Sequence, residues 1–279
     1  MKIKVWGCRG SIPVSGKEFL KYGGDTTCIE IRSKNNDLII IDAGSGIRPL
    51  GNLISGDDLK AISILFTHAH LDHVLGFPFF KPIYNEKATL CIYGCVTSQD
   101  SIRKIISKTM SPPTFPIKFD DIRAAVKFKS ACCNIFNIGP IEITPINLSH
   151  PNGGTGFKFT EDGKSFVFLT DNELTYTHPT GLSFEEYTKF CRNADVLFHD
   201  SEYNKEEYSY TKTWGHTVYT DSLNLAIKAN VKNFGLFHHN QNRNDAQVQE
   251  IENDCKQIIK DKKSNLNCYA VFQGMEIQI

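Results

Sequence analysis

Four side chains that can bind metal ions lie very close together in the chain. After the apolar run 62–66, which is typical of a buried strand, come His68, His70, Asp72 and His73. In an extended segment, side chains two residues apart point the same way, so His68 and His70 can both reach one metal ion. As the chain turns, Asp72 and His73 are placed on the other side, where they can bind a second ion. We therefore predict a site for two divalent ions.

This His-x-His-x-Asp-His pattern after a strand resembles the metal-binding signature of the metallo-β-lactamase superfamily. The resemblance implies an α/β fold, a four-layer αββα sandwich with two mixed sheets flanked by helices. It also implies a dinuclear metal centre at one edge of the sheets and mostly hydrolytic chemistry. No linker or repeat divides the sequence, so we expect residues 1–279 to form a single domain. Residues 77–149 are the hardest to interpret and are a possible flap or interface insertion.

The resemblance also points to further ligands near the ends of later strands. His150 comes after an expected hairpin, and Asp171 follows an apolar strand where the superfamily has a bridging aspartate. His238 directly follows another strand, so we prefer it to His239 for the last position. The implied ligands are His68, His70 and His150 for one ion, Asp72, His73 and His238 for the other, and Asp171 between them. Asp42, in an Asp-x-Gly segment, is expected to support the site without binding metal.

Imidazole and carboxylate ligands suit zinc, with manganese or iron as alternatives. Two such ions can share a water, lower its pKa to roughly 7, and stabilise both attacking and leaving oxygens. This chemistry suits phosphodiesters, and it also serves lactones, thioesters and β-lactams. The metal ligands therefore do not determine which of these substrate classes is hydrolysed.

A second pair of residues narrows the chemistry. In the ribonuclease Z branch of the superfamily, a His-Glu dipeptide precedes a His-Ser-Thr motif whose histidine donates a proton to the leaving oxygen. Residues 199–200 and 215–217 resemble these motifs, with Asp in place of Glu. We expect Asp200 to orient His216 as the proton donor, because an alkoxide is a poor leaving group. Asp72 is expected to help orient the nucleophile, and His178 to lie on the surface.

Charge and loop lengths bear on the substrate. Lys and Arg number 31, as do Asp and Glu, so no overall positive field favours a nucleic acid. Members that process tRNA carry a long flexible arm, whereas here only short loops separate the later motifs. The resemblance is therefore nearer to small-molecule phosphodiesterases, and nucleic acid is possible but not favoured.

The expected function is hydrolysis of a small phosphodiester, first a 3′,5′-cyclic nucleotide, by attack of a metal-bridged hydroxide. The alternatives are a ribonuclease Z-like RNA 3′-end endonuclease and a carboxylic ester, lactone or thioester hydrolase. A non-catalytic metal-binding role is the remaining class.

The nine cysteines are scattered through apolar runs, and we interpret them as buried free thiols of a reducing compartment. The N-terminal sequence has no apolar segment of signal-peptide length, and no run is long enough to cross a membrane. We expect a cytoplasmic protein without a membrane partner. The resemblance also implies a homodimer, for which the apolar stretches 77–85 and 111–119 could provide the interface.

Overall fold

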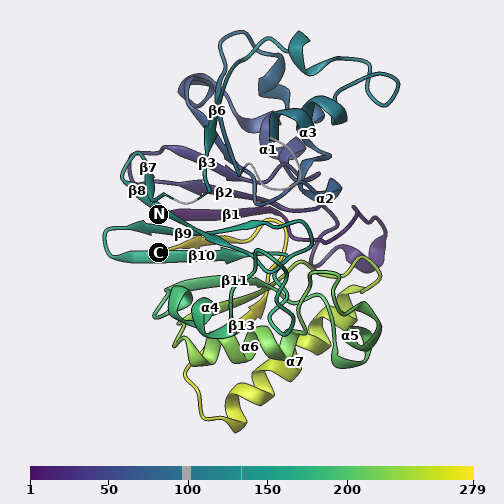
Figure 1. Cartoon of the computed structure of the whole chain (residues 1–279), viewed down its shortest axis with the longest axis vertical. Helices are drawn as coiled ribbons and strands as arrows, with labels where there is room; N and C mark the ends of the chain where they lie inside the picture. The colour runs from purple at the N-terminus through teal and green to yellow at the C-terminus, as the bar shows by residue number, and fades with distance from the viewer. Residues whose placement is uncertain (96–101, 133) are drawn as a thin grey trace.

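A computed structural model of the chain describes residues 1–95, 102–132 and 134–279. Two seven-stranded sheets pack face to face, and helices cover the outer side of each, giving four layers (Figure 1). This is the αββα sandwich that the sequence predicts.

The first sheet has the order β14-β1-β2-β3-β4-β5-β6, and its strands from β3 to β6 are parallel. Its strands are β1 (Lys2–Gly7), β2 (Cys28–Arg32), β3 (Leu38–Ile41), β4 (Ile62–Leu65), β5 (Thr89–Gly94), β6 (Ala125–Ser130) and β14 (Glu276–Gln278). Its outer core includes side chains of α1 (Ile47–Leu53), α2 (Leu71–Val74) and α3 (Ile102–Thr109). Both faces of β3 and β4 are buried, which explains why their sequences are aliphatic apart from Ser63.

The second sheet has the order β13-β12-β11-β10-β9-β8-β7, with parallel pairing from β10 to β13. Its strands are β7 (Phe136–Ile138), β8 (Ile141–Asn147), β9 (Thr155–Glu161), β10 (Lys164–Leu169), β11 (Val196–Asp200), β12 (Asn233–Phe237) and β13 (Asn267–Ala270). The helices of this half are α4 (Phe184–Cys191), α5 (Lys205–Thr211), α6 (Tyr219–Lys228) and α7 (Asp245–Asp261). Buried side chains of α4, α6 and α7 pack on its outer face.

The space between the two sheets is filled mainly by aliphatic and phenylalanine side chains. Along β10, Phe166 and Phe168 belong to this central core, while Val167 and Leu169 face the helices on the other side. All four are 0% exposed, as alternation along a strand buried on both faces requires.

Strands β3, β4, β8, β10, β11 and β12 all point their carboxyl ends toward one edge of the sandwich. Neighbouring parallel strands do this by definition, and β8 runs in the same direction as β10 because β9 pairs antiparallel with both. Polar residues that directly follow these strands are therefore brought together, although they are far apart in the sequence.

The stretch 77–149 supplies β5 and β6 to the first sheet and β7 and β8 to the second. At its start, Phe77, Phe80 and Ile83 are 0% exposed and pack in the outer core of the first sheet. This end of the stretch is therefore core, whereas Phe79 between them is 56% exposed.

One expectation about the cysteines is wrong. Cys95 and Cys132 form a disulfide across 37 residues, so these two are not free thiols. They follow β5 and β6, which are parallel neighbours with Gly94 opposite Ser130, and this pairing brings the two sulfurs together. The disulfide weakens the argument for a reducing compartment that rested on free thiols. In the described part of the chain, no helix combines the length and apolar character needed to cross a membrane.

Candidate active site

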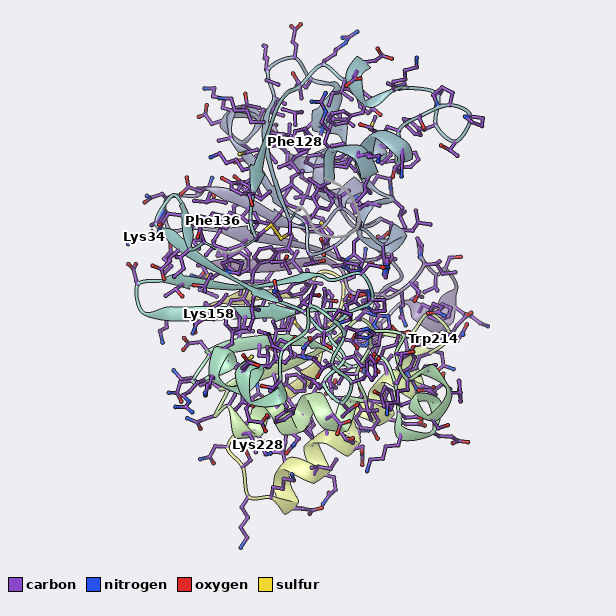
Figure 2. The ribbon with its side chains drawn as sticks, viewed as in Figure 1. Lys34, Phe128, Phe136, Lys158, Trp214 and Lys228 are labelled. Carbon is purple, nitrogen blue, oxygen red and sulfur yellow. A yellow bond between two sulfur atoms is a disulfide. The ribbon has the colours of Figure 1, made fainter. Side chains whose placement is uncertain are left out.

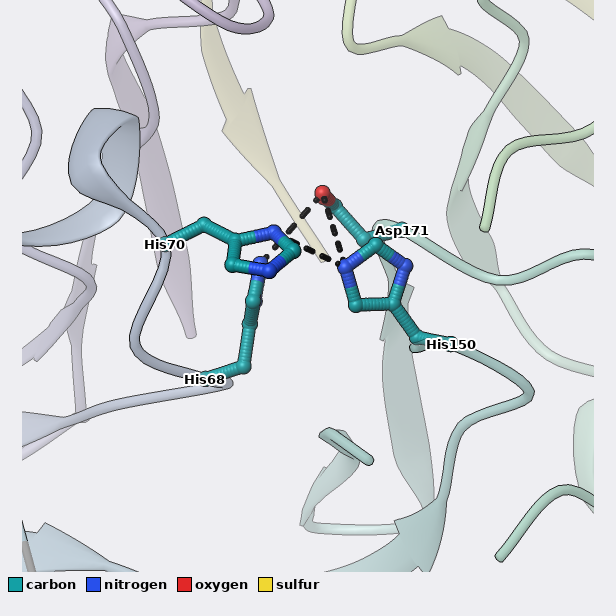
Figure 3. A group of neighbouring side chains, drawn as sticks. All are labelled: His68, His70, His150 and Asp171. Atoms are coloured by element: carbon teal, nitrogen blue, oxygen red, sulfur yellow. Dashed lines mark hydrogen bonds and ion pairs between the residues drawn. The ribbon is translucent and has the colours of Figure 1, made fainter. Parts of the chain in front are cut away.

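The first group of candidate ligands is His68, His70, His150 and Asp171, whose side chains point toward one another at the edge of the sandwich (Figure 3). The Nε2 atom of His68 lies 3.5 Å from Oδ2 of Asp171, and Nδ1 of His70 lies 3.0 Å from Nε2 of His150. Two of these residues follow β4, one follows β8 and one follows β10. The loop that follows β4 of the first sheet therefore meets the ends of β8 and β10 of the second sheet.

The second group is Asp72, His73 and His238. Oδ2 of Asp72 lies 3.3 Å from Nε2 of His73 and 3.2 Å from Nε2 of His238. The same oxygen accepts a hydrogen bond from the backbone N–H of Ser11 at 2.9 Å. Oδ2 of Asp72 therefore contacts both imidazoles and the N-terminal loop.

Asp171 lies between the two groups and offers a different oxygen to each. Its Oδ1 is 3.3 Å from Nε2 of His73 and 3.4 Å from Nε2 of His238, while its Oδ2 faces the first group. A carboxylate can bind two ions in this way, one through each oxygen. The geometry is the one expected of a bridging ligand.

The donor atoms fit divalent metal ions. Among the described residues, Nε2 of His68 and Nε2 of His73 are buried without a hydrogen-bond partner. Such atoms are rare in folded proteins unless a water or an ion completes the site. In each of the two groups, imidazole and carboxylate ligand atoms lie within 4.8 Å of one another, an arrangement that suits divalent ions, and Asp171 and His238 form a third such group with His216.

The ring nitrogens that face away from the cluster have fixed partners. Nδ1 of His73 is 2.8 Å from Oδ2 of Asp42, and Nδ1 of His238 is 2.8 Å from Oε2 of Glu202. Nδ1 of His150 is 3.0 Å from the carbonyl oxygen of Gly215. Contacts of this kind fix the tautomer and orientation of a metal-binding histidine.

Asp42 thus lies behind His73, as expected of a supporting residue. Glu202 was missed by the sequence analysis, although it follows Asp200 by two residues at the end of an apolar strand. That position was the signal that could have identified it.

Three residues of the site have an unusual backbone conformation. Asp42 and His238 directly follow a strand, Asp171 comes two residues after one, and their φ values are 59°, 59° and 54°. A left-handed conformation at a residue other than glycine costs about 1–2 kcal/mol and persists where the surroundings enforce it. At each of these positions the chain turns sharply at or just after the end of the strand.

Burial keeps the histidines of the first group neutral. It lowers the pKa of His68 and His70, and it lowers that of His150 to about 3. Burial alone would raise the pKa of Asp171, but the nearby imidazoles, with His238 contributing most, hold it well below its usual value. The first group therefore offers free imidazole lone pairs and a charged carboxylate, the forms that bind metal.

His216 and Asp200 are paired beside this cluster. Nδ1 of His216 lies 2.7 Å from Oδ2 of Asp200, 3.5 Å from Oε2 of Glu202 and 4.0 Å from Oδ2 of Asp171. Burial would lower the pKa of His216, but these carboxylates outweigh it and raise the pKa to about 9. His216 is thus held protonated and oriented, as a proton donor must be.

The remaining histidines have other partners. His239 points away from the cluster, and its Nε2 donates to the carbonyl oxygen of Val271 at 2.7 Å. Nδ1 of His199 lies 2.7 Å from the carbonyl oxygen of Asp200. The expectation that His178 lies on the surface is wrong, because it is 6% exposed and its Nε2 lies 2.9 Å from Oε2 of a buried glutamate, Glu173.

Comparison with known proteins identifies relatives over most of the chain. A family model described as the beta-lactamase superfamily domain matches residues 38–239. A protein named ribonuclease Z from Sulfurisphaera tokodaii is 27% identical over 241 residues, which cover 75% of this chain and 80% of that protein.

Two solved structures share the fold along their whole length. The metallo-beta-lactamase fold protein YhfI from Bacillus subtilis has a TM-score of 0.73 at 17% identity, covering 99% of this chain and 98% of its own. The short form of human tRNase Z has a TM-score of 0.68 at 17% identity, covering 100% and 99%. At this level of identity they establish the fold alone.

Proposed function

The chain belongs to the beta-lactamase superfamily, and from this premise we propose that it hydrolyses phosphodiester bonds with two divalent metal ions. Membership of this superfamily confirms the predicted fold and the prediction that the protein is a metal-dependent hydrolase. The proposed ligands are His68, His70 and His150 for one ion, Asp72, His73 and His238 for the other, and Asp171 for both. The imidazole-rich set favours zinc, with manganese or iron as alternatives.

The observation that carries the proposal is the His216–Asp200 pair beside the metal cluster, at 2.7 Å. Ions bound there would activate a water and stabilise the charge that develops on phosphoryl oxygens. The alkoxide that leaves a phosphodiester also needs a proton, which Nε2 of His216 can supply while Asp200 holds Nδ1. An activated ester or thioester has a better leaving group and has less need of such a donor.

Among phosphodiesters, we propose RNA as the first substrate class. The curated relatives are named ribonuclease Z, at 27% identity for one and at 21% identity over 98% of this chain for another from Latilactobacillus sakei. They favour the RNA 3′-end alternative over the cyclic nucleotide that the sequence analysis placed first. They also weigh against the view that nucleic acid is the less favoured partner.

A small diester remains the second candidate because of one structural feature. Between His150 and Asp171 the chain forms only the β9–β10 hairpin, whose strands pair from Lys164 opposite Glu161 onward. No projecting arm for a large RNA is built into that segment.

One experiment separates these candidates. The protein, loaded with zinc or manganese, is incubated with a precursor tRNA bearing a 3′ trailer and, separately, with a pool of 3′,5′-cyclic nucleotides. We expect cleavage of the RNA near the start of the trailer, abolished in Asp72→Ala. Consumption of a cyclic nucleotide alone would favour the second candidate, and no turnover of either substrate would overturn phosphodiester hydrolysis.

We also propose a homodimer, as the resemblance implied. Phe79 and Phe115 come from the two apolar stretches and their rings meet edge to face with centroids 5.6 Å apart. Phe79 is 56% exposed, so this pair presents apolar surface to a second copy. A monomeric mass in solution would contradict the dimer. Location in the cytoplasm stays a prediction.

A further inference from the structure

Glu173 is a buried carboxylate to which the proposed reaction gives no role. It is 1% exposed. Its Oε1 accepts hydrogen bonds from the hydroxyl of Tyr208 at 2.6 Å and from the backbone N–H of Thr213 at 2.8 Å. Its Oε2 accepts from the backbone N–H of Gly215 and faces Nε2 of His178, both at 2.9 Å. Each oxygen therefore has two partners, about as many as a carboxylate can accept.

Two of these donors are backbone groups of the loop that carries His216. In this loop, Thr213 and Gly215 have φ values of 78° and 94°, which lie in the left-handed region. A β-branched residue such as Thr213 rarely adopts this conformation, so the surroundings must impose it. Trp214 between them is 61% exposed and lies at the margin of the molecule (Figure 2). Side-chain packing at Trp214 therefore contributes little to holding the loop. The backbone N–H of Trp214 donates to the carbonyl oxygen of Thr211 at 3.0 Å, and Glu173 binds the N–H groups of the residues on either side of it.

Gly215 links Glu173 to two residues of the proposed active site, His150 and His216. Its N–H donates to Glu173, its carbonyl oxygen lies 3.0 Å from Nδ1 of His150, and the next residue is His216. A Cβ atom at Gly215 would lie 2.0 Å from Nδ1 of His150, so the backbone passes directly against the cluster. A small displacement of this loop would therefore move His216 relative to Asp200.

We propose that Glu173 is a positioning residue for the proton donor. By holding the N–H groups of Thr213 and Gly215, it fixes the loop so that His216 meets Asp200 beside the reacting phosphate. The inference rests on the proposed function, since a proton donor matters only when the leaving group is poor. A misplacement of about 1 Å in such a group can cost on the order of 100-fold in rate.

The test compares two substrates that differ in their need for a proton. An RNA linkage leaves as an alkoxide, whereas bis(p-nitrophenyl) phosphate loses a stable phenolate that needs none. In Glu173→Gln, one oxygen acceptor becomes an amide donor of similar shape. We expect kcat to fall about 10- to 100-fold on RNA and less than about threefold on the aryl diester. Glu173→Asp, which keeps the charge but shortens the reach, should show the same selectivity and provides a second variant.

Glu161→Gln is the matched control. Glu161 is also buried, at 3% exposed, but it lies at the far end of β9, where it binds the backbone N–H of Lys34 and the terminal amine of Met1. We expect it to leave both activities unchanged.

The outcomes separate this inference from the proposed function. Wild-type protein inactive on both substrates would overturn the proposed function and the inference together. Active wild type with equal losses on both substrates in the Glu173 variants, or with no loss, would overturn only the inference. Metal content is measured on the same samples. If the Glu173 variants bind less metal than wild type, the substitution acts through the metal ligand His150, and this result would overturn the assignment to His216.

Discussion

The strands of the second sheet differ between their bodies and their carboxyl ends. β10 places Phe166 and Phe168 in the core between the sheets and is followed by Asp171. β12 likewise places Phe237 in this core and is followed by His238. The bodies are apolar and regular, whereas Asp171 and His238 beyond them are polar, buried and left-handed. Residues in the body of a strand thus stabilise the fold, whereas residues beyond its end form the site. Substitutions in the body should therefore lower stability, and substitutions beyond the end should lower activity.

The largest effect on activity is expected at a strand end. Asp171→Asn keeps the size of the side chain but loses the charge that serves both ligand groups. We expect activity to fall by at least about 10³-fold, because metal ions contribute several kcal/mol to such reactions. Metal content by mass spectrometry should fall as well, while the unfolding midpoint in urea of the chelated variant stays close to that of chelated wild type. A variant with activity within tenfold of wild type would contradict a shared ligand.

The converse is expected in the strand body. Phe166 is 0% exposed and its ring lies 5.1 Å from that of Phe198 across to β11. Phe166→Ala should lower the free energy of unfolding by about 3–5 kcal/mol through loss of buried contacts and creation of a cavity. Activity per folded, metal-loaded molecule should remain near that of wild type. If activity fell in molecules that remain folded, the separation between body and end would be wrong.

A smaller effect is expected one layer behind the ligands. Glu202→Gln weakens the hydrogen bond that orients His238, now 2.8 Å long. Loss of such a partner typically reduces metal affinity by about 10- to 100-fold. Competition with a chelator measures this affinity, and Glu161→Gln should be unchanged in the same assay. Unchanged affinity in Glu202→Gln would remove the proposed role of Glu202.

The smallest effect concerns His239, the neighbour that does not join the cluster. Its burial, with Arg9 nearby, lowers its pKa to about 3. The unfolded chain, with an ordinary histidine pKa near 6.5, takes up the proton first as the pH falls, so stability is lost from about pH 6.5 downward. At pH 5 this amounts to about 2 kcal/mol.

His239→Gln has no such proton to take up, and its amide can still donate to Val271. Between pH 7 and pH 5, chelated wild-type protein should therefore lose about 2 kcal/mol more unfolding free energy than the variant. Urea unfolding at the two pH values measures this difference. Identical losses would show that His239 can accept a proton in the folded state.

Much of the site could be predicted because its chemistry lies at strand ends. His68, His70, Asp72 and His73 are adjacent in the sequence, and runs such as 62–66 and 165–170 mark the strands that precede ligands. His150, Asp171 and His238 come together in the structure with them, as the superfamily pattern implied.

What could not be predicted depends on contacts between distant segments. His178 lies in a Thr-His-Pro loop that looks exposed. In the fold it is buried, with its Nε2 2.9 Å from Oε2 of Glu173 and its backbone N–H donating to Oγ of Ser149 at 3.0 Å. The disulfide between Cys95 and Cys132 depends on the parallel pairing of β5 and β6, which nothing in the local sequence reveals.

The most direct test of the account is a zinc titration of chelated protein, with bound metal and RNA cleavage measured on the same samples. We predict no cleavage without metal and a rise that reaches its plateau at two ions per chain, with Asp171→Asn inactive throughout. Cleavage in the absence of metal, or a plateau at one ion per chain, would contradict a centre built from both ligand groups.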